Sequence, residues 1–162
     1  MLKKNNDHTV LITGGFGLLG GRLAHMMDRL GYQIILGTRQ KKDTPLWLHE
    51  SRVLTIDWDE QDSLNRACHG IEFIIHAAGM NAKECASEPE AALAFNGEAT
   101  ARFINTAANE GVARFIYIST AHVYSSRLVG LINEDSPITN IHPYATSNII
   151  GENAVLSADK TR

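Results

Sequence analysis

Short apolar runs alternate along this chain with longer stretches in which apolar residues recur at helical spacing. The runs predict strands, and the periodic stretches between them predict helices. Alternation of this kind is typical of a parallel sheet that helices cover on both faces. The predicted strands are 10–12, 32–36, 53–56, 71–76 and 113–119, and the predicted helices are 18–30, 60–68, 89–109 and 144–157, with a short helix beginning at 45–48.

The first predicted strand breaks into a glycine-rich turn, and residues 9–21 read T-V-L-I-T-G-G-F-G-L-L-G-G. The spacing fits G-x-G-x-x-G from residue 15 and G-x-x-G-x-x-G from residue 14. Backbone N–H groups at a helix N-terminus carry partial positive charge, and glycines let a pyrophosphate approach closely. We therefore expect this turn to bind a dinucleotide through Gly14, Gly15, Phe16, Gly17, Leu18, Leu19 and Gly20.

The unusual residues of the chain follow the other predicted strands. Arg39 follows the second strand, Asp57 the third, Ala77-Ala78-Gly79 the fourth and Ser119-Thr120 the fifth. Open parallel sheets bind ligands beyond the carboxyl ends of their strands. These positions are therefore candidates for the same site as the glycine-rich turn.

The residues after the second strand bear on the choice of dinucleotide. An acidic residue there would bond the adenosine ribose and favour NAD, but this chain has Gly37, Thr38 and Arg39. Arg39 offers a planar fork of donors for a 2′-phosphate, so we expect NADP(H) to be preferred, with NAD(H) as the alternative. Lys41 and Lys42 fit a solvated basic loop.

Asp57 has two interpretations. Its carboxylate could accept a hydrogen bond from an adenine amino group, or it could cap the next helix. Asp59 and Asp62 are also placed to cap that helix.

Composition excludes several classes of function. The net charge of -3 argues against general nucleic-acid binding. Cys68 and Cys85 have no metal or redox spacing and suggest a reducing compartment. No apolar run reaches the ~20 residues of a membrane span, and the N-terminus lacks a signal-peptide core. We expect a cytoplasmic protein without a membrane partner or a metal site, folded as a single domain over residues 1–162.

The chain resembles the extended short-chain dehydrogenase/reductase family, of the NAD-dependent epimerase/dehydratase type. The residues that carry the resemblance are 13–20, Ile56-Asp57, 76–79, Asn96, 117–124, 134–137 and Pro143-Tyr144. The resemblance implies a Rossmann-type doubly wound sheet of about five strands in the order 3-2-1-4-5. It also implies that Ala77, Ala78, Gly79 and Asn96 lie at the cofactor.

The resemblance assigns catalytic roles to the last part of the chain. Tyr144 matches the tyrosine that exchanges a proton with the substrate while the nicotinamide exchanges a hydride, and it also lies at the cofactor. Thr120 matches the hydroxyl that orients the substrate, with Ser119 as a second candidate. We interpret His76 as structural or cofactor-adjacent, and His122 and His142 as loop residues.

The chain departs from the family pattern at one catalytic position. The family has a lysine four residues after the tyrosine, where this chain has Asn148. A tyrosine has a pKa of ~10, so without a nearby cation it is a poor base at neutral pH. Asn148 can bond a ribose but supplies no charge.

The chain also ends after the tyrosine helix, where the family continues into a substrate-binding part. We therefore expect the fifth strand to lie at a sheet edge that invites association, so a homo-oligomer is a candidate assembly. The leading hypothesis is an NAD(P)-dependent oxidoreductase, epimerase or dehydratase acting on a nucleotide sugar or small carbonyl compound. The alternatives are a dinucleotide-binding module without turnover, and a truncated remnant or fragment of a longer enzyme.

Overall fold

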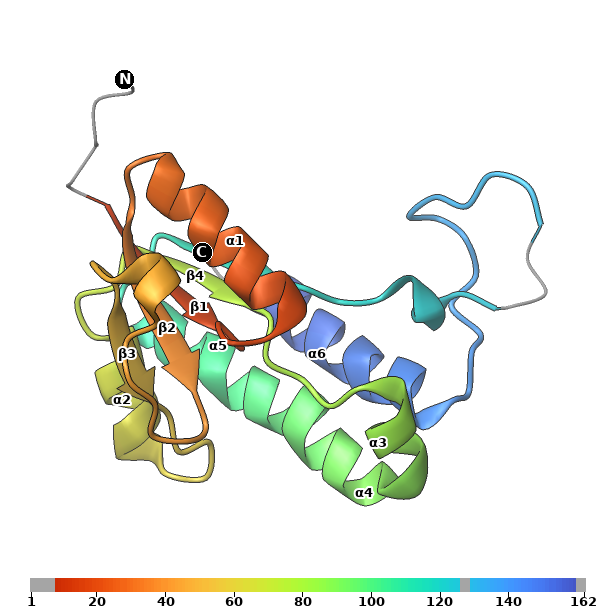
Figure 1. Cartoon of the computed structure of the whole chain (residues 1–162). Helices are drawn as coiled ribbons and strands as arrows, with labels where there is room; N and C mark the ends of the chain where they lie inside the picture. The colour runs from red at the N-terminus through yellow and green to blue at the C-terminus, as the bar shows by residue number, and fades with distance from the viewer. Residues whose placement is uncertain (1–7, 126–128, 160–162) are drawn as a thin grey trace. The chain divides into compact units, whose positions relative to one another are not determined.

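The computed structural model describes residues 8–125 and 129–159, and the chain divides into two compact units (Figure 1). Unit 1 comprises Met1–Ala78 and Phe103–Ile118, and unit 2 comprises Gly79–Arg102 and Ser119–Arg162, within the described residues. The prediction of a single domain over residues 1–162 stays a prediction.

Unit 1 contains one parallel sheet of five strands. The strand order is β3-β2-β1-β4-β5, so the predicted Rossmann-type topology is confirmed. Ile12 of the central strand lies in register with Leu36 on one side and Ile75 on the other. The strands are β1 (Thr9–Thr13), β2 (Gln33–Thr38), β3 (Arg52–Thr55), β4 (Phe73–His76) and β5 (Arg114–Tyr117).

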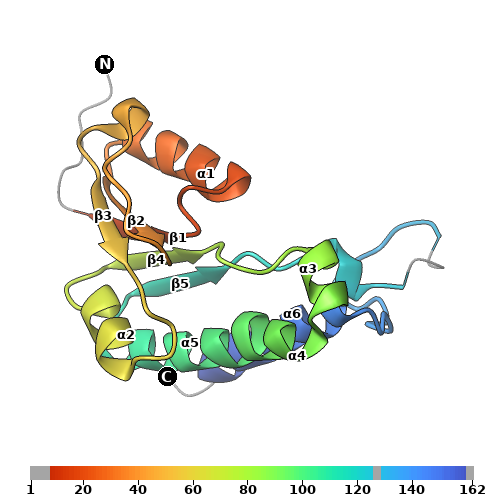
Figure 2. The same ribbon diagram turned by 60° about the horizontal axis from the view of Figure 1, so that its bottom comes forward.

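The helices of unit 1 cover the two faces of this sheet (Figure 2). Helix α1 (Leu18–Arg29) lies on one face, where Ala24 joins a buried cluster with Ile12 and Leu36. Helix α2 (Gln61–Cys68) and residues 103–109 of α5 (Thr100–Asn109) lie on the other face. Apolar side chains that alternate between the faces of each strand explain why both faces need a cover.

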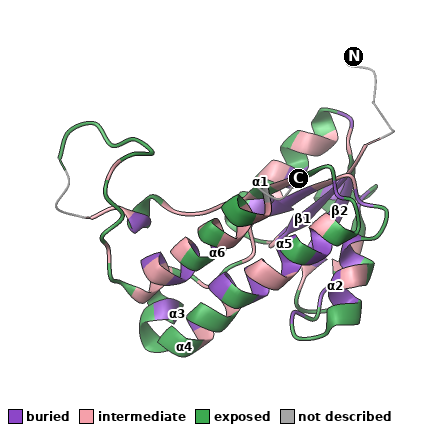
Figure 3. Cartoon of the chain, turned by 180° about the vertical axis from the view of Figure 1, so that it is seen from behind, coloured by how far each residue is buried: buried purple, intermediate pink, exposed green. Residues whose placement is uncertain are grey.

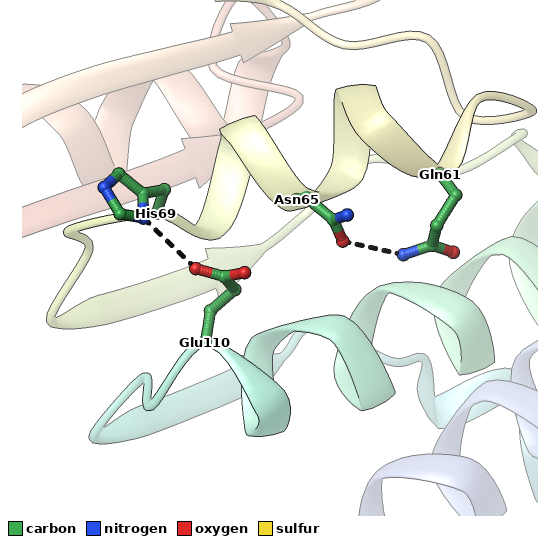
Figure 4. A network of polar contacts seen from close by, with 4 residues as sticks. All are labelled: Gln61, Asn65, His69 and Glu110. Atoms are coloured by element: carbon green, nitrogen blue, oxygen red, sulfur yellow. Dashed lines mark hydrogen bonds and ion pairs between the residues drawn. The ribbon is translucent and has the colours of Figure 1, made fainter.

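Polar contacts join α2 to α5 on that second face (Figure 4). The Gln61 side chain donates both to Asn65 Oδ1 and to Thr106 Oγ1, each at 2.9 Å. His69 Nδ1 lies 3.2 Å from Glu110 Oε2. The contacts of Gln61 with Asn65 and of His69 with Glu110 are exposed, whereas Thr106 is buried, so apolar burial carries most of the packing energy between these helices.

Unit 2 contains helices that the sequence pattern predicts only in part. Helix α3 (Ala82–Ser87) is not among the predicted elements, although Asn81 and Glu84 form a complete capping box at its start. The predicted helix 89–109 consists of α4 (Pro89–Ala92), a π-helical segment η2 (Leu93–Ala99) and α5. The unit is completed by the 3-10 turn η3 (Ala121–Val123) and by α6 (Pro143–Asp159).

The π-helical segment lies directly against α6. A Cβ at Gly97 would approach Ile150 Cγ2 to 3.0 Å, so the absence of a side chain permits this contact. Isolated π-helical segments often occur at functional sites, and this one carries Asn96.

No helix within the described part of the chain is long and apolar enough to cross a membrane.

Candidate functional site

The turn after β1 in unit 1 needs glycine for two separate reasons. Gly14 has φ +65°, and a Cβ there would lie 2.7 Å from the carbonyl oxygen of Ala77. A Cβ at Gly20 would collide with the carbonyl oxygen of Gly14. The first turn of α1 therefore approaches the loop backbone as closely as backbone atoms allow, and β1 and β4 end beside each other there.

The N-terminus of α1 is open to an anion. Its N-cap residue is Gly17, which makes no side-chain capping hydrogen bond, and the first turn contains no acidic residue. Leu18 and Leu19, which follow, are both exposed. Uncompensated N–H dipoles at a helix start favour a negatively charged group, and phosphate is the usual one.

A buried histidine, His76, is hydrogen-bonded to Thr13, the last residue of β1 before the turn. Thr13 Oγ1 lies 2.7 Å from His76 Nδ1 and accepts a hydrogen bond from the Ala78 N–H at 3.2 Å. His76 lies among aromatic rings, with the centroids of Trp58 and Phe103 at 5.4 and 5.3 Å. Burial lowers the pKa of His76 to about 3, so the imidazole is neutral and acts as a structural residue at the ends of β1 and β4.

The other site candidates of unit 1 lie at the carboxyl ends of their strands. Arg39 is exposed immediately after β2. Phe16 of the glycine-rich turn is covered by Lys42, whose Nζ lies 4.7 Å from the ring centroid. Lys42 is exposed, as expected for a solvated loop, and it also contacts this ring.

Asp57 is exposed after β3, and its Oδ1 accepts the Asp59 N–H at 3.1 Å. The interpretation of Asp57 or Asp59 as the cap of the next helix is wrong. The N-cap of α2 is Glu60, which makes no side-chain capping bond, and Asp62 lies inside the first turn. Asp57 instead closes a short turn because its carboxylate reaches the backbone two residues further on.

Asn96 organises the first part of unit 2. Its Oδ1 accepts the Met80 N–H at 2.7 Å, and its Nδ2 donates to Ser147 Oγ at 3.2 Å. A Cβ at Gly79 would lie 3.3 Å from Asn96 Oδ1. Cys85 Sγ also lies 3.4 Å from Asn96 Nδ2, and burial raises the pKa of this thiol. Asn96 thus connects residues 79–80 to α6. Met80 and Ser147 are its hydrogen-bond partners, and sequence spacing could not predict them.

The hydroxyl candidates of unit 2 have different partners. Thr120 Oγ1 accepts the His122 N–H at 3.1 Å and caps η3. Ser119 Oγ donates to the Glu152 carboxylate of α6. Glu152 is not among the predicted site residues, because its partner is 33 residues away in the sequence.

Tyr144 lies at the start of α6 between two histidines. Its N–H donates to His142 Nδ1 at 3.1 Å, and its ring meets the ring of His122 edge to face at a centroid distance of 5.7 Å. Asn148 is 5% exposed, and its Nδ2 donates to the Tyr144 carbonyl oxygen at 2.7 Å. The amide at the lysine position is therefore bonded to the backbone of its own helix.

Each unit thus assembles its own subset of the predicted residues. Unit 1 brings the glycine-rich turn together with Ala77 and Ala78. Unit 2 brings Gly79 to Asn96, and Tyr144 to Asn148 and to the turn that Thr120 caps. Among the described residues, no cluster of His, Cys, Asp and Glu could hold a metal ion.

Comparisons with known proteins place this geometry in a family. The dTDP-glucose 4,6-dehydratase of Streptomyces niveus is 25% identical over 170 residues, which cover 94% of this chain and 49% of that protein. The ceramide reductase of Caulobacter vibrioides is 30% identical over 153 residues, which cover 93% of this chain and 42% of that protein. The chain thus spans about half the length of these curated relatives.

Among solved structures, the Bordetella bronchiseptica enzyme WbmG in complex with NAD has a similar fold. Its TM-score is 0.83 at 22% identity, over 98% of this chain and 52% of WbmG. The family model described as NAD dependent epimerase/dehydratase matches residues 10–162. The chain therefore belongs to the NAD-dependent epimerase/dehydratase family.

Proposed function

We propose that unit 1 binds a nicotinamide dinucleotide and that the glycine-rich turn holds its pyrophosphate. The observation that carries this proposal is the close approach of Gly14 and Gly20 below an uncapped, acid-free helix start. A Cβ at either glycine would collide with backbone atoms of the protein itself, so both glycines are needed for the turn to keep the shape that presents the helix start to a phosphate. The residues that would hold the dinucleotide are Gly14, Gly15, Phe16, Gly17, Leu18, Leu19, Gly20, Asp57, Ala77 and Ala78.

We propose NADP(H) as the preferred form, with NAD(H) as the alternative. Arg39 is exposed at the end of β2, where a guanidinium can bind a 2′-phosphate through two hydrogen bonds. The position has no carboxylate to repel that phosphate.

Unit 2 would supply the groups that act on the substrate. When bound, the nicotinamide supplies a hydride donor or acceptor. The Tyr144 hydroxyl would give a proton to the substrate oxygen or take one from it, and Thr120 or Ser119 would orient that oxygen. Gly79 and Asn96 would lie at the cofactor.

The reaction class that we propose is that of an epimerase, dehydratase or reductase. Of the two relatives described above, one is named for dTDP-glucose and the other for ceramide. The substrate that we propose is a nucleotide sugar or a small carbonyl compound.

A second candidate function is dinucleotide binding without turnover. The observation in its favour is Asn148, whose buried amide donates to the Tyr144 carbonyl oxygen. A neutral amide cannot stabilise a tyrosinate as a lysine ammonium does, and each pKa unit lost costs up to about a factor of ten in rate. This candidate keeps the binding role of unit 1 and removes the hydride exchange.

Calorimetric titration with NAD(H) and NADP(H) tests the common part of both candidates. We expect binding of at least one dinucleotide, and absence of binding would exclude both. Arg39→Ala should weaken NADP(H) binding about tenfold or more and change NAD(H) binding less than about twofold. Lys41→Ala is the matched control from the same exposed loop and should leave the ratio of the two affinities unchanged. An equal loss for both dinucleotides in Arg39→Ala would contradict the assignment of Arg39.

A further inference from the structure

Residues 129–141 form a segment of unit 2 with unusually exposed apolar side chains, which we name the apolar loop. Val129 is 93% exposed, Leu131 92% and Ile141 90%, and Ile132 and Ile138 are also exposed. The segment leads into α6 and is coloured as exposed over most of its course (Figure 3). Single exposed apolar residues are common, but five within one short segment indicate a binding surface.

The apolar loop is attached to η3, the 3-10 turn that Thr120 caps. Near its end, Asn140 Nδ2 donates to the His122 carbonyl oxygen at 2.7 Å, and the Asn140 N–H donates to that of Val123 at 3.4 Å. The ring of His122 in turn contacts the ring of Tyr144. The end of the apolar loop at Asn140 is therefore tied to the turn whose His122 ring meets Tyr144.

Most of the charged side chains that the structure describes in unit 2 are acidic. Among its described side chains, two are basic, Lys83 and Arg102, and seven are acidic. The acidic residues are Glu84, Glu88, Glu90, Glu98, Glu134, Asp135 and Glu152. A diphosphate is normally bound by arginine, lysine or a free helix N-terminus.

Side chains already accept hydrogen bonds from backbone N–H groups at the starts of two helices in unit 2. The Asn81 side chain accepts from the backbone at the start of α3, and His142 Nδ1 accepts the Tyr144 N–H at the start of α6. Two residues of the apolar loop itself, Glu134 and Asp135, are acidic. Apolar side chains together with negative charge fit an uncharged hydrocarbon and oppose a nucleoside diphosphate.

We propose that unit 2 takes an uncharged carbonyl compound, or its alcohol, with a hydrocarbon body that the apolar loop binds. This inference rests on the proposed function and selects the carbonyl compound over the nucleotide sugar. Burial of the hydrocarbon against Leu131 and Ile141 supplies the binding energy, so affinity rises with chain length.

A series of methyl ketones tests the inference on the full chain. The probes are 2-butanone, 2-hexanone, 2-octanone and 2-decanone, with UDP-glucose as the anionic comparison, and binding is measured by ligand-observed NMR. We expect affinity to rise about twofold to fourfold for each added methylene. The double variant Leu131→Ser/Ile141→Ser should flatten this rise, whereas Glu134→Gln in the same loop should leave it unchanged.

Two results would overturn the inference. One is tighter binding of UDP-glucose than of 2-decanone, and the other is an equal dependence on chain length in the double variant. Leu131 and Ile141 are almost fully exposed, so their replacement does not disturb the packing of the unit. Titration of the same samples with NADP(H) and NAD(H) separates the two proposals. Dinucleotide binding without ketone binding refutes this inference alone, whereas absence of dinucleotide binding refutes the proposed function and, with it, the role of the ketone as substrate.

Discussion

The turn after β1 in unit 1 and the segment from Ser119 to Asn148 in unit 2 are built on different principles. In the turn, backbone shape decides what can bind, because Gly14 and Gly20 leave no room for a Cβ. In the segment, the chemistry that we propose depends on individual side chains, and residue 148 is asparagine, not lysine. A site made of backbone keeps its function as long as its glycines remain. A site made of side chains can exchange one of them and keep its shape, and Asn148 is buried and bonded to the Tyr144 carbonyl oxygen of its own helix.

The largest expected effect is at Gly14. Gly14→Ala places a Cβ at a positive φ and 2.7 Å from the Ala77 carbonyl oxygen. Strain in the left-handed region and overpacking together should lower the free energy of unfolding by about 3 kcal/mol. Dinucleotide affinity should fall at the same time. Urea unfolding and calorimetric titration measure the two losses.

Gly70→Ala is the matched control for this variant. Gly70 has nearly the same backbone conformation, with φ +68°, but a Cβ added there would have nothing within 4 Å. It should lose only the part of the stability that the positive φ accounts for, about 1–2 kcal/mol, and should bind the dinucleotide normally. Equal losses of stability and affinity in both variants would show that close approach at the turn is unimportant.

The next effect concerns His76, which supports the turn. An unfolded histidine binds a proton near pH 6.5, whereas burial lowers the pKa of His76 in the folded protein to about 3. Between these values the unfolded state binds more protons, so the free energy of unfolding falls by about 1.4 kcal/mol for each pH unit of acidification. From His76 alone we expect a loss of about 2 kcal/mol between pH 6.5 and 5, and no change above pH 7.

His76→Phe suits the aromatic surroundings and should remove this pH dependence from urea-unfolding curves. His69→Gln is the comparison variant, because it removes an imidazole that is exposed and lies outside the aromatic cluster around His76. A parent protein and a His76→Phe variant that lose stability in parallel would mean that His76 is protonated in the fold.

The sequence predicts the sheet and the turn after β1 in unit 1 better than it predicts the contacts of the segment from Ser119 to Asn148. Apolar runs at β1, β2 and β4 and the glycine spacing are local signals, so the strands and the turn can be predicted from them. The π-helical segment escapes prediction because its apolar residues recur much as they do in an α-helix. The capping box of Asn81 and Glu84 is readable as N-x-x-E but lies in a segment with little apolar periodicity.

Polar contacts between residues far apart in the sequence cannot be predicted from it, for a different reason. Ser119 meets Glu152, and Asn96 meets Ser147, only after helices from distant parts of the sequence have packed. Sequence spacing indicates which residues share one element, but it does not indicate which elements become neighbours. Asp57 illustrates the same limit, since its position allows a helix cap and the structure instead shows a short turn.

The third prediction tests whether residue 148 alone limits unit 2. Asn148→Lys restores a cation four residues after Tyr144, on the same face of α6. If the rest of the segment is intact, reduction of carbonyl compounds by NADPH or NADH should rise about tenfold or more, since each unit of pKa depression at a catalytic tyrosine is worth about that factor. Absorbance at the nicotinamide band measures the rate.

The double variant Tyr144→Phe/Asn148→Lys is the control and should show no gain. A gain that persists without the Tyr144 hydroxyl would assign the chemistry to another residue. No gain in Asn148→Lys, with dinucleotide binding unchanged, would favour the function of binding without turnover.

The smallest predicted effect tests whether a hydrogen bond that does not involve residue 148 stabilises the position of Ser119 in unit 2. Ser119 Oγ donates to the Glu152 carboxylate, which ties the residue before Thr120 to the helix that carries Tyr144. Hydrogen bonds to charged groups contribute about 1.5–3 kcal/mol when buried, but Glu152 is half-exposed, so we expect about 1 kcal/mol. A double-mutant cycle of Ser119→Ala and Glu152→Ala, followed by urea unfolding, isolates this coupling from the better helix propensity of alanine. Glu152→Gln keeps an acceptor oxygen and should retain about half of the coupling. A coupling energy near zero would mean that the 3-10 turn alone holds Ser119 and Thr120. Side-chain contacts would then determine the positions of only some of the candidate residues in unit 2.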